Sequence, residues 1–257
     1  MLHLLLDPFL DLVYPETCAV CGSRPGHVAW SARGDRCGGL RFFDAPHLCA
    51  ACEAHLATGV VHRPAAGPDG MGPPVVGAAQ THPDLVRLVG LFKYQGIRGL
   101  AWPLARLMAS GWAPGNRLHG EVAGLVPVSL HRARRRSRGF NQAEILCRLL
   151  GKMTGLPVLD GILVRSRRTR QQAKETGPDG RRRNLEGAFR GRTVDESDGE
   201  VRRICLVDDL VTSGWTVGAA ASALDRAGWS VGWVLALGLA AGPGKGVRQV
   251  DTRDGGF

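Results

Sequence analysis

An acidic pair and a glycine turn follow an apolar stretch near the end of this 257-residue chain. Residues 204–207 are apolar, Asp208 and Asp209 come next, and two further apolar residues lead into Thr212-Ser213-Gly214-Trp215-Thr216. We interpret this order as a buried strand, two carboxylates, a turn and an amphipathic helix. Ligands of parallel sheets bind beyond the carboxyl ends of the strands, where a helix N-terminus offers unpaired N–H groups to phosphate. The turn 212–216 is therefore predicted to bind a phosphate group.

The two carboxylates cannot favour the same phosphate, so they need a different target. Vicinal hydroxyl groups of a sugar suit Asp208 and Asp209 best, with a divalent cation nearby. A ribose 5-phosphate would satisfy both halves of the motif. The alternative is a strand end without a ligand, in which an aspartate caps the helix and the hydroxyl residues form the turn.

A second motif concentrates positive charge after another predicted strand. Five arginines stand within residues 132–138, directly after a strand predicted at 125–128. A loop here would share the carboxyl edge of the sheet with the acidic pair. Arg132, Arg136 and Arg138 are the candidates for binding pyrophosphate, because the guanidinium fork suits phosphate oxygens. A solvated basic loop and a nucleic-acid contact are the alternatives.

The net charge of +10 arises from one region. Residues 131–203 hold 19 Lys and Arg against 9 Asp and Glu, whereas the rest of the chain is balanced. This distribution indicates a polyanionic partner at one place, and both nucleic acid and a pyrophosphate-bearing small molecule fit it. Within this region a Gly-Pro-Asp-Gly turn at 177–180 separates two arginine clusters, which predicts a hinged loop that closes over an anionic substrate. A basic loop without a catalytic role is the alternative.

Two Cys-x-x-Cys pairs stand near the N-terminus. Cys18 with Cys21 and Cys49 with Cys52 can supply four thiolates to one structural zinc ion. The 27 residues between the pairs exceed the usual gap, so Cys37, His47 and His55 remain open as substitutes or bystanders. Four protein ligands leave no position for catalysis, and such a site would stabilise the fold, dock a partner or contact nucleic acid.

The elements that must position these residues alternate between strand and helix. Apolar periodicity predicts an α/β fold with a mainly parallel sheet flanked by helices. Asn141 is predicted to cap one of the helices, with Phe140 as its hydrophobic staple. Predicted strands lie at 125–128, 156–164, 203–207 and 231–239, and predicted helices at 85–92, 100–112, 141–153 and 216–227.

The chain divides by composition. We predict an N-terminal helix and cysteine-rich zinc module at 1–62, a linker at 63–74, the main domain at 75–245 and a disordered tail at 246–257. No apolar run is long enough to cross a bilayer as a helix. The apolar N-terminus carries Asp7 and Asp11 and no basic region, which favours a docking helix over a signal peptide and predicts a cytoplasmic protein with reduced thiols.

The segment 204–216 resembles the phosphoribosyl-pyrophosphate (PRPP) signature of type I phosphoribosyltransferases. Trp215 departs from it, because the family usually has a small residue there. Over most of its length the chain further resembles the ComF competence family, although Ser129 replaces a usual proline and the gap between the cysteine pairs is longer. The matching elements are Lys93-Tyr94-Gln95-Gly96, Arg138 to Gln142, Thr169 with Gln172, Arg181 with Asn184, and Gly187-Ala188-Phe189.

The resemblance implies a type I phosphoribosyltransferase fold behind a zinc module. It implies that an acceptor displaces pyrophosphate from PRPP, with Mg²⁺ neutralising the pyrophosphate. Asp208 and Asp209 would orient the ribose hydroxyls, and Thr169, Gln172, Arg181 and Asn184 would belong to the flexible loop. The rival hypothesis is a non-enzymatic competence factor that uses the fold as a scaffold to bind single-stranded DNA or the competence machinery.

Overall fold

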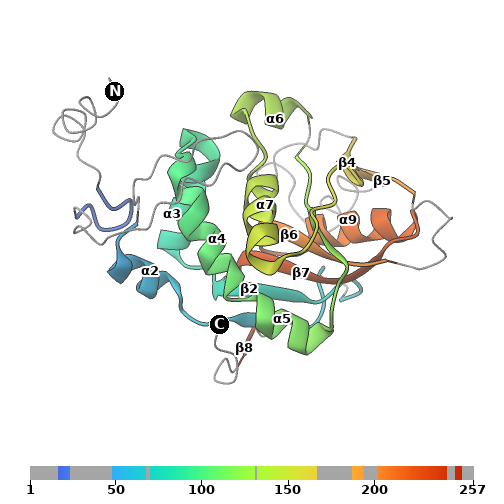
Figure 1. Ribbon diagram of the computed structural model, residues 1–257, viewed down its shortest axis with the longest axis horizontal. Coiled ribbons are helices and arrows are strands. Elements are labelled where there is room, and N and C mark those ends of the chain that lie inside the picture. The colour runs from blue at the N-terminus through green and yellow to red at the C-terminus, as the bar shows by residue number, and fades with distance from the viewer. Residues whose placement is uncertain are drawn as a thin grey trace.

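The computed structural model describes residues 17–23, 48–67, 70–130, 132–166, 187–193, 202–241 and 247–250. Their centre is a six-stranded sheet with the order β3-β6-β7-β2-β1-β8 (Figure 1). Its strands are β1 (Val61–Arg63), β2 (Val75–Gln80), β3 (Gly124–Pro127), β6 (Arg203–Val211), β7 (Ser230–Leu239) and β8 (Arg248–Gln249).

Four neighbouring strands of this sheet are parallel. β3 pairs with β6, β6 with β7 and β7 with β2 in parallel, whereas β1 pairs antiparallel with β2 and β8. The predicted mainly parallel α/β sheet is thus confirmed. Because parallel strands end on one side, β2, β3, β6 and β7 place the residues that follow them at a common carboxyl edge.

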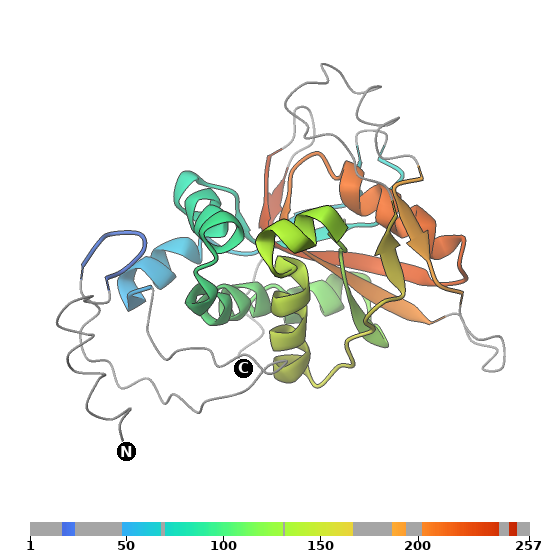
Figure 2. The same ribbon diagram turned by 90° about the horizontal axis from the view of Figure 1, so that it is seen from above.

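Helices cover both faces of the sheet. The α-helices are α2 (Ala50–Leu56), α3 (Pro83–Gly90), α4 (Ala101–Ala109), α5 (Trp112–His119), α6 (Arg132–Arg138), α7 (Gln142–Thr154) and α9 (Trp215–Asp225). A π-helix, η1 (Leu91–Gln95), continues α3, and a 3₁₀-helix, η2 (Arg98–Leu100), leads into α4. Figure 2 shows α4 and α7 on one side of the sheet and α9 on the other.

Two hydrophobic clusters correspond to these two faces. The larger one joins α2, α3, α4 and α7 to the sheet around Phe92, Met108 and Trp233. The smaller one joins α9 to a separate two-stranded sheet made of β4 (Leu163–Arg165) and β5 (Phe189–Gly191). Strand residues alternate between the faces: Cys205 and Val207 belong to the first cluster, whereas Ile204 and Leu206 belong to the second. This alternation also decides where the acidic pair of β6 points.

The strand predicted at 156–164 is largely wrong. Only Val158 forms a bridge, parallel to Leu125 of β3, and Gly161 then adopts a left-handed conformation with φ of 80°. A chain that turns there leaves the main sheet, and Leu163–Arg165 pairs antiparallel with β5 instead. The end of β4, with Arg165, therefore lies over the face of the sheet that α9 covers.

The structure also differs from the predicted division of the chain into zinc module, linker, main domain and tail. β1 lies at the predicted boundary between zinc module and linker, and it is an integral strand of the sheet. Within the predicted linker, Ala66 is fully buried. The tail was predicted to be disordered, but Arg248 and Gln249 form β8 because they pair with β1. No helix within the described ranges is both long and apolar enough to cross a membrane.

Candidate functional site

The glycine turn lies between β6 and α9 at the carboxyl edge of the sheet. Gly214 has φ of 83°, a conformation that L side chains rarely adopt, and it forms the N-cap of α9. A Cβ atom on Gly214 would lie 2.5 Å from the backbone nitrogen of Gly67, so the segment at Ala66–Gly67 packs against the turn. Glycine is required here both for the backbone angle and for this close approach. The N–H groups of the first turn of α9 have no acceptor within the helix, which leaves them for a ligand.

The hydroxyl residues of the turn are accessible. Thr212 is exposed, and Ser213, Trp215 and Thr216 are half-buried. Trp215 is the first helical residue of α9, and its partly buried side chain packs against the smaller hydrophobic cluster. The five residues predicted to bind phosphate thus occupy one short turn, and their role in phosphate binding remains a prediction.

Arg63 fixes the shape of this turn, and sequence reasoning missed it. Its side chain extends from β1, its Nη1 donates a hydrogen bond to the carbonyl of Thr212 at 2.7 Å, and its Nη2 donates to the carbonyl of Ala240. Arg63 is almost completely buried, and burial lowers its pKa. A guanidinium between the carboxyl ends of β6 and β7 adds positive potential beside the turn. No sequence pattern marks this residue, because Arg63 opens a stretch whose composition is that of a linker.

The acidic pair lies inside β6 rather than after it, which corrects the predicted end of the strand. Successive side chains of a strand point to opposite faces. Asp209 accordingly lies on the face that η1 covers, where Lys93 Nζ donates to its Oδ1 at 2.7 Å. The side chains of Lys93 and Asp209 are only 19% and 11% exposed, so the lysine neutralises a carboxylate that water barely reaches.

Asp208 occupies the other face and has a different electrostatic environment. Burial, followed by the negative charge of Asp209, raises the pKa of Asp208 to about 7, and the positive charges of Lys93 and Arg165 oppose the rise. Arg165 ends β4 and stacks over the ring of Phe189, with its guanidinium carbon 5.1 Å from the ring centroid. Two adjacent carboxylates thus differ in environment: Asp209 is held in an ion pair, whereas the pKa of Asp208 is raised toward neutrality.

The predicted arginine loop is a helix, α6. Its backbone can be helical because no proline or glycine interrupts residues 132–138. Arg138 stacks over Tyr94 with its guanidinium carbon 4.7 Å from the ring centroid, and Tyr94 follows the Lys93 that pairs with Asp209. One aromatic contact therefore brings the basic helix to the acidic pair. Arg136 is exposed, and the side chain of Arg132 lies outside the described part.

The start of α7 corrects a second local prediction. Asn141 occupies the N-cap position but makes no capping hydrogen bond. Its Nδ2 donates instead to the carbonyl of Val128 at 3.3 Å, which ties the helix to the end of β3. Phe140 packs on Phe92 with ring centroids 5.4 Å apart and lies under Arg98. The Arg-Gly-Phe-Asn-Gln segment thus anchors the basic helix to the core.

The predicted flexible loop lies outside the described residues. This applies to its four candidate residues, which are Thr169, Gln172, Arg181 and Asn184. The described ends of that segment, β4 and β5, bring Arg165 near Asp208.

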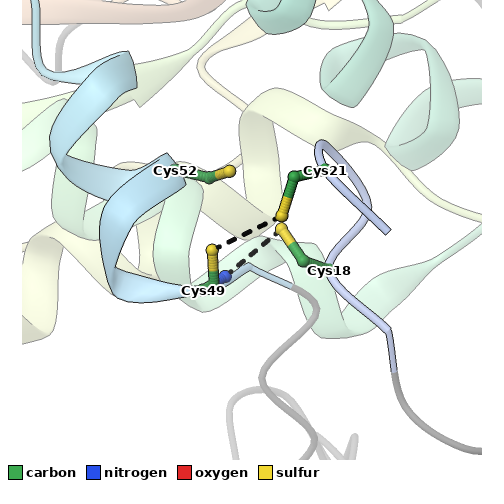
Figure 3. A group of neighbouring side chains, drawn as sticks. All are labelled: Cys18, Cys21, Cys49 and Cys52. Carbon is green, nitrogen blue, oxygen red and sulfur yellow. Dashed lines mark hydrogen bonds between the residues drawn. The ribbon is translucent and has the colours of Figure 1, made fainter. Parts of the chain in front are cut away.

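The four cysteines gather as predicted. The sulfur atoms of Cys18, Cys21, Cys49 and Cys52 all lie within 4.8 Å of one another. Figure 3 shows that they converge from the Cys18–Cys21 turn and from the start of α2. The N–H of Cys49 donates to Cys18 Sγ at 3.4 Å, and Cys21 Sγ lies 3.8 Å from Cys49 Sγ.

The chemistry of this donor set fits a tetrahedral zinc ion. Hydrogen bonds from Ser23 lower the pKa of Cys21 to about 6, whereas burial raises the pKa of Cys52. Four thiols gathered this closely favour a cation that replaces their protons. Cys37 and His47 lie outside the described residues, and His55 is not a member of this group. Cys147 and Cys205 are buried in the core as predicted.

Comparison with known proteins finds relatives that match part of the chain. No protein-family model matches the chain. The chain is 32% identical over 143 residues to competence protein F of Haemophilus influenzae, a match that covers 55% of this chain and 62% of that protein. It is 31% identical over 156 residues to DNA utilization protein YhgH of Escherichia coli (strain K12), covering 60% and 66%, and 32% identical to the YhgH of Salmonella typhi over the same shares. The matches span just under two thirds of these relatives.

We expect Asp208→Asn to stabilise the protein at alkaline pH. The folded-state pKa of Asp208, about 7, lies above the ordinary value of 3.8, so ionising this group costs stability as pH rises between these values. The amide removes that cost, and at pH 8 the free energy of unfolding should rise by on the order of 2 kcal/mol. Urea unfolding at pH 5 and pH 8 measures the difference. Asp160→Asn, at a more exposed carboxylate, is the control, and a gain that does not grow with pH would contradict the assignment.

We expect one zinc ion per chain, held by the four thiols. Metal analysis of the untagged protein should give one equivalent, and Cys52→Ser should lower it by half or more because the ligand set becomes incomplete. Cys147→Ser, at a buried thiol outside the group, is the matched control for an effect on folding. Full zinc content in the Cys52 variant would rule out this ligand set.

Proposed function

We propose that the chain, as a member of the ComF competence family, binds PRPP with Mg²⁺ at the carboxyl edge of its sheet. The observation that carries this proposal is the position of Asp208 near the end of β6, directly before the turn at Gly214 that begins α9. A carboxylate followed by a phosphate-binding turn is the order that a ribose 5-phosphate requires. The 5-phosphate would accept hydrogen bonds from the turn, and the ribose hydroxyls would donate to Asp208.

The charges around the site support this ligand. Arg63 and the first turn of α9 supply positive potential at the phosphate end, and Lys93 leaves Asp208 as the carboxylate with spare acceptor capacity. Arg138 and Arg136 of α6 would face the pyrophosphate, because the stack on Tyr94 holds α6 next to Lys93. We further propose a type I phosphoribosyltransferase fold, since the parallel strands, glycine turn and basic helix occur in the required order.

The proposed reaction is a phosphoribosyl transfer. The bond from the anomeric carbon to the pyrophosphate oxygen breaks, an acceptor forms the new bond, and pyrophosphate leaves with its electron pair. Asp208 would hold the ribose while positive charge develops on its ring, and the arginines of α6 would bind the leaving group. Magnesium, when bound with the substrate, would supply charge neutralisation at the pyrophosphate. We also propose a role in competence or DNA utilization, which the names of the relatives support. The proposed location, the cytoplasm, rests on the sequence alone.

Calorimetry with PRPP and Mg²⁺ tests the ligand. The wild-type protein should bind one PRPP per chain, and Asp208→Asn should weaken binding about tenfold, the equivalent of about 1.4 kcal/mol for one lost set of hydroxyl contacts. Asp208→Asn is preferable to a change at Asp209, because the latter would leave Lys93 without its buried partner. Asp160→Asn should bind PRPP normally. An absence of saturable binding by wild type, or equal binding by Asp208→Asn, would overturn the proposal.

The second candidate function is non-catalytic binding of single-stranded DNA. The observation that favours it is Tyr94, whose side chain is 70% exposed and stacks with Arg138 beside the exposed Arg136. Exposed aromatic rings next to arginines are the elements with which proteins bind unpaired bases and phosphates. Both functions could use α6, because pyrophosphate and the DNA backbone present the same phosphate oxygens.

Salt dependence separates the two functions. If α6 binds DNA, Arg136→Gln should reduce the slope of log K against log salt by about 0.7, the value for one phosphate contact with single strands. Tyr94→Leu should lower affinity by about 1 to 3 kcal/mol without changing that slope, because it removes base stacking only. Fluorescence anisotropy with a labelled oligothymidylate measures both. Asp208→Asn should leave DNA affinity unchanged, and equal slopes for wild type and Arg136→Gln would exclude α6.

A further inference from the structure

A second group of metal-ligating side chains stands apart from the four cysteines. His55, His82 and Asp84 each place one donor atom within 4.8 Å of the donor atoms of the other two. We propose that these three residues bind a divalent transition-metal ion such as Zn²⁺, Co²⁺ or Ni²⁺. The proposal is independent of PRPP binding and of the cysteine site.

Two separate parts of the chain bring these residues together. His55 lies in the last turn of α2, three residues after Cys52, and the buried Leu56 next to it anchors this turn in the core. His82 is the N-cap of α3 and Asp84 is in its first turn, directly after β2. The group therefore joins the cysteine-bearing helix to the carboxyl edge of the sheet.

The contacts within the group leave one donor unexplained. His55 Nε2 lies 3.4 Å from Asp84 Oδ2, which an ion pair alone could account for. The rings of His55 and His82 meet edge to face, with centroids 5.6 Å apart. His82 Nε2 is inaccessible to water and has no hydrogen-bond partner within the described part of the chain. His82 also makes no capping hydrogen bond to α3, so capping does not explain a histidine at this position.

The donor set selects the class of metal. Imidazole nitrogens and a carboxylate oxygen bind zinc at about 2.0 to 2.2 Å, and small side-chain rotations bring three donors within 4.8 Å of one another to that distance. Two imidazoles suit zinc, cobalt or nickel, whereas magnesium and calcium prefer oxygen ligands. The side chains of His55 and Asp84 are 62% and 39% exposed, so solvent or an anion reaches the site. Three protein ligands leave a coordination position open, and a phosphate oxygen or water would fill it.

The test is a titration of the zinc-loaded, untagged protein with CoCl₂. We expect one further equivalent of Co²⁺ per chain, with weak absorption bands and without the intense thiolate charge-transfer band that cobalt shows in a four-cysteine site. His55→Gln and His82→Gln should each weaken this binding roughly tenfold or more, since each removes a ligand. The exposed His55 is the decisive position, because its replacement should not affect folding.

A matched control comes from another histidine pair. The ring centroids of His62 and His119 lie 4.9 Å apart. Within the described residues, Nε2 of each of these histidines is buried and has no hydrogen-bond partner. His62→Gln should leave the second equivalent of cobalt unchanged. The proposal is overturned if wild type binds no further cobalt, if His55→Gln binds it equally well, if His62→Gln abolishes it, or if a thiolate charge-transfer band shows that cobalt has displaced zinc.

Discussion

The ion pair between Lys93 and Asp209 is the interaction on which the arrangement of the site depends. A carboxylate at the end of a central strand, almost excluded from water, would be strongly unfavourable without an opposite charge. Lys93, which lies in η1, supplies that charge to Asp209. Because η1 continues α3, the ion pair joins the helical layer to β6. Asp208 lies on the opposite face, where burial and then the charge of Asp209 raise its pKa. The alternation of side chains along β6 thus gives the two acids different environments.

Arg63 has the corresponding role at the other end of the motif. A turn from a parallel strand into a helix leaves carbonyl groups at the strand end, and buried carbonyls need donors. Arg63 supplies donors to Thr212 and Ala240, which holds the ends of β6 and β7 together. The Ala66–Gly67 segment then packs on Gly214, at the position that a Cβ atom would occupy. The turn is therefore shaped before any ligand arrives.

Sequence periodicity predicted the elements that rest on local patterns. β7, α7 and α9 have uninterrupted apolar or amphipathic runs, and the paired spacing of the cysteines predicted their cluster. The missed features depend on contacts between distant residues. Arg63 bonds to a carbonyl 149 positions away, and the histidine group combines α2 with α3. α6 was read as a loop because five arginines suggest solvation, although arginine is a good helix former. β6 was predicted to end before the acidic pair, but it continues through it. Lys93 neutralises Asp209 there, and the sequence does not show that these two distant residues pair.

The position of α2 relates the N-terminal cysteines to the edge of the sheet. α2 is a seven-residue helix, too short to be stable by itself, so packing against the core must contribute to its stability. Its Leu56 is fully buried in the core that α3 and α4 share, and Glu53 pairs with Arg106 of α4 at 3.5 Å. Movement at the cysteines would therefore reach α3 and, through η1, Lys93 at the acidic pair. A metal that bridges His55 to α3 would stiffen this connection at its midpoint. The helix that carries Cys52 and His55 is accordingly joined by packing to the helices that cover the sheet, up to its carboxyl edge.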